Sequence, residues 1–320
     1  MKQALCLIPV TDAQKQALQQ AAPSYNFTFK ISADKTLTTE EVEQAEIIIG
    51  NTSPKLISKA KNLKWFQLYS AGADAYVKPG ILSENTILTN ATGAYGLAVS
   101  EHMAAQLLEL IKNLHLYRDN QNNSSWKDEG PVRSVRSCTI LILGLGDIGS
   151  SFARIMKGFG AKVIGLKRRP GAKPDYLDEL HLSEKLDELL PKVDVVAMCL
   201  PSTPETTNIM NAQRIASMKP GSFIINAGRG NAVDQNAVCA ALISGQLGGF
   251  GTDVTEPEPL PADHPLWSMK NAVITPHVSG NFHIPEIAET VFNIALENLK
   301  RLQTGQELFN LVDRGTGYKA

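Results

Sequence analysis

The chain contains little cysteine, no long run of apolar residues and no marked excess of either charge. Its four cysteines, spread over 320 residues and each in apolar surroundings, fit neither a disulfide framework nor a metal site. A formal net charge of −1 lacks the basic footprint of a nucleic-acid-binding protein. No segment approaches the roughly 18 apolar residues of a membrane span. We therefore expect a cytoplasmic protein with no nucleic-acid or membrane partner and no metal.

What the sequence does contain is a regular alternation of short apolar segments with helical or turn-rich ones. We expect strands at residues 4–9, 46–50, 65–68, 86–89, 139–143, 162–166, 194–200, 221–226, 249–253 and 272–275. Such alternation predicts parallel sheets covered by helices on both faces. The segment 4–9 lacks the long apolar region and the cleavage site of a signal peptide, which favours an opening strand.

Two long helical patterns set the expected domain boundaries. One, at 97–117, would lead from a first domain to a second, and the other, at 284–302, ends near Gly305 and would return the chain to the first domain. The prediction is an α/β protein with two Rossmann- or flavodoxin-like doubly wound parallel-sheet domains and a cleft between them. The substrate-binding (catalytic) domain would comprise residues 1–97 and 284–320, and the dinucleotide-binding Rossmann domain residues 98–283.

The strand that begins at Thr139 runs directly into a G-x-G-x-x-G motif, which is followed by a helical pattern at 150–157. Gly144 would permit a tight turn, Gly146 would let the backbone approach a pyrophosphate, and Gly149 would let the helix pack on the strand. The N-terminus of the helix adds unpaired N–H groups and a positive dipole end. The motif in this context predicts a dinucleotide site.

Three chemically active residues follow the ends of later strands. Arg229 follows the strand 221–226, Glu258 the strand 249–253 and His277 the strand 272–275. Ligands of doubly wound sheets lie beyond the carboxyl ends of the strands. Taken singly, each residue has an ordinary alternative, as a surface arginine, a solvated loop acid or a capping histidine. Together, at one sheet edge, they favour an active site.

With these residues the sequence resembles the D-isomer-specific 2-hydroxyacid dehydrogenase family, in particular its NADP-preferring glyoxylate/hydroxypyruvate reductase-like members. The resemblance covers roughly residues 71 to 280. It rests on seven segments in the family's order, at 70–74, 98–102, 144–149, 200–206, 226–230, 253–261 and 275–277.

The resemblance implies a homodimeric, nicotinamide-dependent oxidoreductase acting on the CH–OH group, with Arg229, Glu258 and His277 as the catalytic residues. It also implies that backbone N–H groups around Ala71 and Gly72 bind the substrate together with Arg229 and His277. Asp253 would face the nicotinamide. The expected cofactor contacts are Gly144, Gly146, Asp147, Ile148, Gly149, Lys167, Arg168, Arg169, Pro201, Thr206, Ala227, Arg229, Asp253, Ser279 and Gly280.

The three catalytic residue types suit the reduction of a 2-oxo acid, in which a hydride reaches the carbonyl carbon and a proton its oxygen. His277 is the candidate general acid, because its ordinary pKa lies closest to neutral. Glu258 would favour the imidazolium and orient the ring. Arg229 offers a planar fork for the substrate carboxylate and can polarise the ketone.

One segment departs from the commoner pattern of the family. An NAD enzyme places an acid at the end of the second Rossmann strand, where it holds the ribose 2′-OH, but this chain has Lys167, Arg168 and Arg169 there. An ordinary solvated basic turn is the alternative. We expect a pocket for the 2′-phosphate, and therefore NADP(H) in preference to NAD(H).

The sequence leaves the substrate open among glyoxylate, hydroxypyruvate and bulkier 2-oxo acids. Two alternative functions also remain: a cofactor-sensing protein like the corepressors related to this family, and a formate or phosphite dehydrogenase. His102, in one of the matched segments, is expected to be structural. Trp126, in a polar stretch, could reach either the substrate or a partner subunit.

Overall fold

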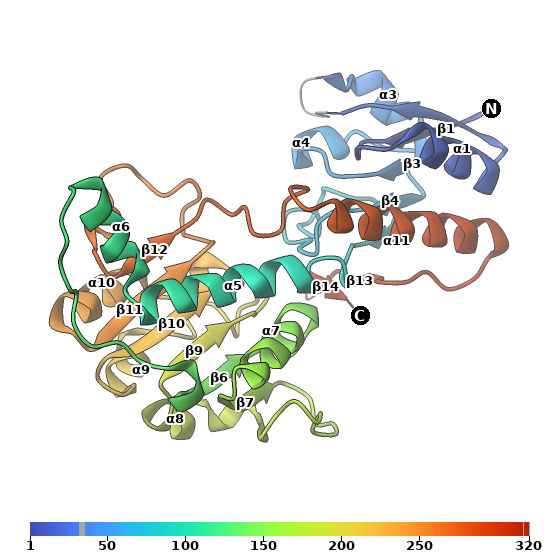
Figure 1. Ribbon diagram of the computed structural model, residues 1–320. Helices are drawn as coiled ribbons and strands as arrows, with labels where there is room; N and C mark the ends of the chain where they lie inside the picture. Colours follow the sequence, from blue (N-terminus) through green and yellow to red (C-terminus); the bar gives the residue numbers. More distant parts are fainter. Residues whose placement is uncertain (32–35, 316, 320) are drawn as a thin grey trace. The chain divides into compact units, whose positions relative to one another are not determined.

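A computed structural model of the protein describes residues 1–31, 36–315 and 317–319. The chain divides into two compact units, one of Met1–Tyr95 with Phe282–Ala320 and one of Gly96–Asn281. Each unit has a parallel sheet of its own (Figure 1). The expected pair of parallel-sheet α/β domains is therefore confirmed.

The first unit holds a five-stranded sheet in the order β2-β1-β3-β4-β5, which is the flavodoxin-like order. Its strands are β1 (Lys2–Cys6), β2 (Tyr25–Phe29), β3 (Ala45–Ile49), β4 (Trp65–Gln67) and β5 (Ile87–Thr89), and every pair is parallel. Four of them lie within a few residues of the expected strands. β2 was not predicted, because this edge strand alternates apolar with polar residues and has no continuous apolar run.

This unit also contains α1 (Asp12–Ala21), α3 (Thr39–Gln44), α4 (Pro54–Ile57) and α11 (Pro285–Thr304). α11, drawn in red in Figure 1, packs against α1 and ends at Gly305, whose φ of 68° is the left-handed conformation of a helix C-cap. The chain therefore returns to the first unit through this long final helix. A short hairpin of β13 (Val312–Asp313) and β14 (Tyr318–Lys319) follows.

The second unit holds a seven-stranded parallel sheet in the order β12-β11-β10-β9-β6-β7-β8. Its strands are β6 (Thr139–Leu143), β7 (Lys162–Lys167), β8 (Glu179–Leu182), β9 (Val195–Met198), β10 (Ser222–Asn226), β11 (Leu247–Thr252) and β12 (Ala272–Ile274). Starting from β6, this is the dinucleotide-binding order with one further strand, β12, at its edge. Only β8 was not predicted, and it too is an edge strand.

Helices cover both faces of this second sheet. Leu141 of β6 and Ile224 of β10 belong to a buried cluster with residues of α8 (Leu186–Leu189), α9 (Ala212–Ser217) and α10 (Gln235–Ser244). The next residue of β6, Ile142, points to the other face, toward α7 (Asp147–Gly158). α5 (Gly96–Ile111) packs against α7 on that face (Figure 1).

The expectation of one helix from 97 to 117 was wrong. α5 ends at Ile111, and α6 (Leu114–Asn122) begins after Asn113, which has a φ of 56°. Asparagine adopts this left-handed conformation more readily than most residues. The apolar periodicity continues through the break, which is why the pattern suggested a single helix.

Candidate active site

The glycine motif forms the turn between β6 and α7, and its three glycines have different surroundings. Gly144 has a φ of 90°, and a Cβ there would lie 2.8 Å from the carbonyl oxygen of Cys199. A Cβ on Gly149 would collide with the carbonyl oxygen of Gly144, so the helix could not pack on the turn. A Cβ on Gly146 would meet no described atom within 4 Å. The open side at Gly146 is where a pyrophosphate can approach the backbone.

α7 begins directly at this turn, with Gly146 as an N-cap that supplies no side-chain hydrogen bond. Its first N–H groups therefore suit a phosphate. The carboxylate of Asp147, by contrast, accepts a hydrogen bond of 2.7 Å from the N–H of Gly96 at the start of α5. This bond ties the two helices together next to the turn. The residues present fit a dinucleotide, and a role of Asp147 in holding it stays a prediction.

The basic segment follows β7, the strand next to β6 in the sheet. Lys167 is half-buried and its Nζ lies beside Gly171, whereas Arg168 and Arg169 are exposed. Glu205, in the loop after β9, has a pKa lowered chiefly by hydrogen bonding with Thr203 and also by the charge of Arg168. The loops on both sides of the glycine turn thus lie close enough for their charges to interact.

The loop after β9 is braced by its own side chains. Thr206 donates a hydrogen bond of 2.6 Å to the carbonyl of Pro201 and accepts one of 2.8 Å from the N–H of Thr203. Both Pro201 and Thr206 were expected to contact the cofactor. The hydroxyl of Thr206 serves within the loop, and a contact of either residue with the cofactor stays a prediction.

Arg229 lies in a tight turn after β10 that two glycines permit. A Cβ on Gly228 would lie 2.6 Å from the carbonyl oxygen of Leu200, and a Cβ on Gly230 would collide with the backbone of Thr255. The side chain of Asn226, which is 1% exposed, accepts from the N–H of Gly228 and donates to the carbonyl of Arg229, both at 3.0 Å. Asn226 thus holds the turn that presents Arg229. No role of Asn226 was expected from the sequence, although Asn226 begins a matched segment.

His277 and Glu258 form a direct pair. Nδ1 of His277 lies 2.8 Å from Oε2 of Glu258, whose other oxygen accepts a hydrogen bond of 3.1 Å from the N–H of Thr255. Since the carboxylate accepts, Nδ1 carries a proton. Nε2 of His277 has no hydrogen-bond partner among the residues that the structure describes. It is therefore the nitrogen available for proton transfer.

The electrostatics of the pair favour an ionised carboxylate and a charged imidazole. The hydrogen bond with Glu258 raises the pKa of His277; burial opposes this, and the charges of Glu258 and Asp253 reinforce it. Partial burial raises the pKa of Glu258, but its bond to His277 and the nearby positive charges lower it overall. Arg229 is close enough for its charge to lower the pKa of both groups. The structure thus brings together the three predicted catalytic residues.

The backbone of His277 has a φ of 52°, a conformation that is rare for residues other than glycine. Such a conformation costs about 1–3 kcal/mol and persists only where the surroundings hold it. The N–H of His277 donates to the carbonyl of Asp253 at 2.8 Å and also to that of Thr275 at 3.0 Å. The loop after β12 is therefore fixed to the end of β11.

Asp253 has a different setting from the one expected. Its side chain, in a residue only 1% exposed, accepts from the hydroxyl of Thr275 at 2.6 Å, the N–H of Val278 at 3.0 Å, and both the N–H and the hydroxyl of Ser279. These four bonds occupy the carboxylate within the protein. Asp253 holds the loop that carries His277, and a direct contact with a nicotinamide stays a prediction.

Ala71 and Gly72 belong to the first unit, in a loop after β4. Four consecutive carbonyls of this loop accept hydrogen bonds: that of Tyr69 from Tyr95, that of Ser70 from the N–H of Ala91, that of Ala71 from Asn90 and that of Gly72 from the hydroxyl of Ser70. The N–H groups of residues 70 to 72 have no partner within the described part of the chain. Successive free N–H groups of this kind suit a carboxylate.

Among the described residues, no group of three or more histidine, cysteine, aspartate or glutamate side chains is arranged to hold a metal ion. None of their helices is both long and apolar enough to cross a membrane. The four cysteines are free thiols, of which Cys6, Cys138 and Cys239 are buried.

The glycine turn at a parallel sheet, with a histidine–carboxylate pair and an arginine at the same sheet edge, defines a dinucleotide-dependent oxidoreductase. Residues 104–279 match the sequence model of the D-isomer specific 2-hydroxyacid dehydrogenase NAD binding domain. The chain belongs to the D-isomer specific 2-hydroxyacid dehydrogenase family, and it is an NAD(P)-dependent oxidoreductase, as the sequence predicted.

Similar proteins of known name span nearly the whole chain. Glyoxylate/hydroxypyruvate reductase B of Yersinia pestis (strain Pestoides F) is 31% identical over 284 residues, covering 85% of each chain. A family protein from Aeromonas salmonicida has a solved structure with 33% identity and a TM-score of 0.84, covering 98% of this chain and 99% of that one. Another, from Xanthobacter autotrophicus Py2 in complex with NADPH and MES, has 29% identity and a TM-score of 0.82, covering 99% and 100%.

Proposed function

We propose that this protein reduces a small 2-oxo acid, such as glyoxylate or hydroxypyruvate, to the D-2-hydroxy acid with NADPH. The observation that carries the proposal is the 2.8 Å hydrogen bond between His277 and Glu258, next to the charge of Arg229. The pair keeps an imidazolium available, with Nε2 facing away from Glu258. The name of the Yersinia relative supports the substrate class.

Bound cofactor supplies the hydride that the substrate's carbonyl carbon receives. His277 donates the proton from Nε2 to the carbonyl oxygen, while Glu258 holds Nδ1 and stabilises the charged ring before transfer. Arg229 binds the substrate carboxylate through its planar fork and polarises the ketone.

The pair of His277 and Glu258 also favours ketone reduction over formate oxidation. Removal of a hydride from formate yields carbon dioxide and releases no proton from a hydroxyl group, so that reaction needs no general acid or base. A histidine whose pKa is raised by Glu258 has a direct use in a reaction where a proton moves with the hydride. A cofactor-sensing protein of the same fold would keep the same three residues, so turnover of 2-oxo acids is the property that separates it from an enzyme.

The preference for NADP(H) is supported by the charge of the segment after β7. Arg168 and Arg169 are exposed at the end of the strand next to the glycine turn, and Lys167 stands where an acid would repel a 2′-phosphate. The solved Xanthobacter relative holds NADPH. Both observations agree with a pocket for the phosphate.

The experiment is a panel of substrates followed by nicotinamide absorbance. Glyoxylate, hydroxypyruvate, pyruvate and phenylpyruvate are each tested with NADPH and with NADH, and formate and phosphite with NADP⁺ and NAD⁺. We expect the highest kcat/KM for a small 2-oxo acid with NADPH. Turnover of formate or phosphite alone, or no turnover at all, would refute the proposal.

We further propose that the protein is a homodimer that associates through residues 114–132, here called the α6 arm. None of the residues of α6, all of which the structure describes, is buried. The arm exposes four large apolar side chains, namely Leu114 at 52%, Tyr117 at 36%, Trp126 at 106% and Val132 at 47%. Exposed apolar side chains gathered in this way mark interaction surfaces.

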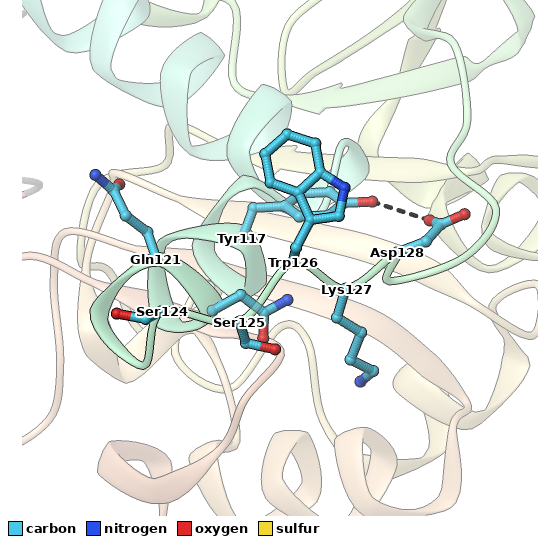
Figure 2. Close-up of a pocket in the computed structure, with 8 residues that line it drawn as sticks. Tyr117, Gln121, Ser124, Ser125, Trp126, Lys127 and Asp128 are labelled. Atoms are coloured by element: carbon cyan, nitrogen blue, oxygen red, sulfur yellow. Dashed lines mark hydrogen bonds between the residues drawn. The ribbon is translucent and has the colours of Figure 1, made fainter.

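Trp126 is the most exposed of these four side chains. Figure 2 shows its indole projecting away from the backbone, beside a hydrogen bond of 3.1 Å from the hydroxyl of Tyr117 to Asp128. Tyr117 and Trp126 line a hollow of about 630 Å³ together with Asn120, Gln121, Ser124, Ser125, Lys127 and Asp128. A two-fold dimer would place the same arm of both copies in one interface.

A further inference from the structure

Thr275, the residue after β12, lies between a helix and the loop that carries His277. Its Oγ1 is 2.6 Å from Oδ1 of Asp253 and 2.8 Å from Nε2 of His102, which belongs to α5. We propose that Thr275 and His102 are positioning residues, which hold the loop in the conformation where His277 can act as the general acid. This inference rests on the proposed function for its catalytic consequence.

The direction of each hydrogen bond follows from the groups themselves. The hydroxyl of Thr275 has one proton, and the carboxylate of Asp253 can only accept, so the proton of Thr275 goes to Asp253. Oγ1 of Thr275 must then accept from His102, and Nε2 of His102 carries the proton of the ring. The side-chain amide of Gln106 donates to the same oxygen at 3.3 Å.

Asp253 also contacts the loop that carries His277. Its carboxylate accepts from the N–H groups of Val278 and Ser279, and its backbone carbonyl accepts from the N–H of His277. With a φ of 52°, His277 depends on these bonds, because the conformation is unfavourable for a residue with a side chain. Through its bonds with His102 and Gln106, the hydroxyl of Thr275 connects Asp253 and the loop to α5.

α5 is suited to be the fixed point. It packs against both β11 and β12, the strands that Asp253 and Thr275 directly follow, and its contact with β11 is close. A Cβ on Gly251 of β11 would lie 3.1 Å from the side chain of Gln106. His102 and Gln106 are one helical turn apart and therefore point to the same side. The helix thus presents two donors to a single oxygen.

The primary test compares Thr275→Val with Thr275→Ser in the full-length protein. Valine has the shape of threonine but removes the hydroxyl, whereas serine retains it. We expect Thr275→Val to lower kcat for 2-oxo acid reduction ten- to a hundredfold, the range for loss of a hydrogen bond to a charged group. The KM for NADPH should change less than threefold, and Thr275→Ser should recover most of kcat. Thr86→Val is the matched control, because it removes a buried threonine hydroxyl in the first unit.

A second pair of variants tests His102, the residue of α5 in this series of hydrogen bonds. His102→Leu should lower kcat several-fold, and His102→Gln, which keeps an N–H donor, should recover it. His181→Leu is the control, because His181 is similarly half-buried but lies on β8 at the opposite edge of the sheet. This pair remains informative if Thr275→Val fails to fold, because His102 is partly exposed.

Amide hydrogen exchange gives a readout that does not require turnover. Exchange of the N–H groups of Val278 and Ser279 should accelerate at least tenfold in Thr275→Val and remain unchanged in Thr275→Ser. Inactivity of the unmodified protein toward every 2-oxo acid would overturn the proposed function while the exchange result still decides the positioning role. An active protein in which Thr275→Val and His102→Leu keep kcat within twofold would overturn the positioning role alone.

Discussion

Nδ1 of His277 and Oε2 of Glu258 lie 2.8 Å apart, at the ends of loops that follow adjacent strands of one parallel sheet. Nineteen residues separate the two side chains in the chain. Their pairing depends on the left-handed backbone of His277 and on the bond between Thr255 and Glu258. Glu258 therefore affects the pKa of His277, and the conformation of the two loops brings the side chains together. Each of these two features can be tested.

The first prediction concerns the pH dependence of reduction. Glu258 raises the pKa of His277, so the imidazolium persists to higher pH than in a free histidine. Reduction should be fast below that pKa and should decline as pH rises through it. In Glu258→Gln the contribution of the Glu258 charge to the raised pKa of His277 is lost, and the declining limb of kcat/KM should move to lower pH. Oxidation of the D-2-hydroxy acid needs the neutral ring, so its rising limb should move the same way. Unshifted limbs would contradict the pairing.

The second prediction concerns Arg229. Arg229→Lys keeps the positive charge but loses the planar fork that binds a carboxylate through two parallel bonds. We expect kcat/KM for 2-oxo acids to fall on the order of a hundredfold, while the dissociation constant for NADPH, measured by fluorescence, stays within about threefold. Retention of most of the wild-type kcat/KM would show that Arg229 does not bind the substrate.

The third prediction separates the roles of two glycines in one turn. Gly149→Ala places a methyl group against the carbonyl of Gly144, and such overpacking costs about 1–3 kcal/mol. Tm should then fall by about 2–12 °C, the range for a domain of this size. Gly146→Ala meets no described atom, so Tm should be unchanged while NADPH affinity falls. Equal effects of the two variants on Tm would mean that the turn is not packed as described.

The fourth prediction concerns cofactor preference. One hydrogen bond from a charged group to the 2′-phosphate contributes about 1.5–3 kcal/mol, which corresponds to roughly a ten- to hundredfold preference for NADPH over NADH. Changing Arg168 and Arg169 together to Ala should raise the KM for NADPH by that factor and leave the KM for NADH nearly unchanged. Equal KM values for both cofactors in the unmodified protein would contradict the preference for NADP(H) before any variant is made.

The fifth prediction concerns the α6 arm. Trp126→Ala should shift the protein from dimer to monomer at micromolar concentration, as measured by sedimentation velocity, because the indole is fully exposed in the single chain. Trp267→Ala is the matched control, since that tryptophan is 53% exposed but lies outside the arm. A monomeric unmodified protein, or equal behaviour of the two variants, would argue against this interface.

The sequence by itself determined the features that depend on neighbouring residues. Apolar runs located the buried strands, the spacing of Gly144, Gly146 and Gly149 located the turn, and the pattern before Gly305 located the last helix. Each of these signals can be read from a short stretch of sequence, because the spacing of apolar residues indicates whether the stretch forms a strand or a helix. The strand-end rule then placed Arg229, Glu258 and His277 at one edge without any knowledge of their contacts.

Only the tertiary structure decided which groups those side chains contact. The bond from His102 to Thr275 spans 173 residues, and that from Thr275 to Asp253 spans 22. Such partners depend on which strands are neighbours in the sheet and which helix covers them, and no local pattern encodes this order. The same holds for the break at Asn113 and for the edge strands β2 and β8, which are weakly apolar and are completed by pairing with a neighbour. Hydrophobic periodicity therefore located the elements, and long-range packing assigned the roles of Asp253, Thr275 and His102.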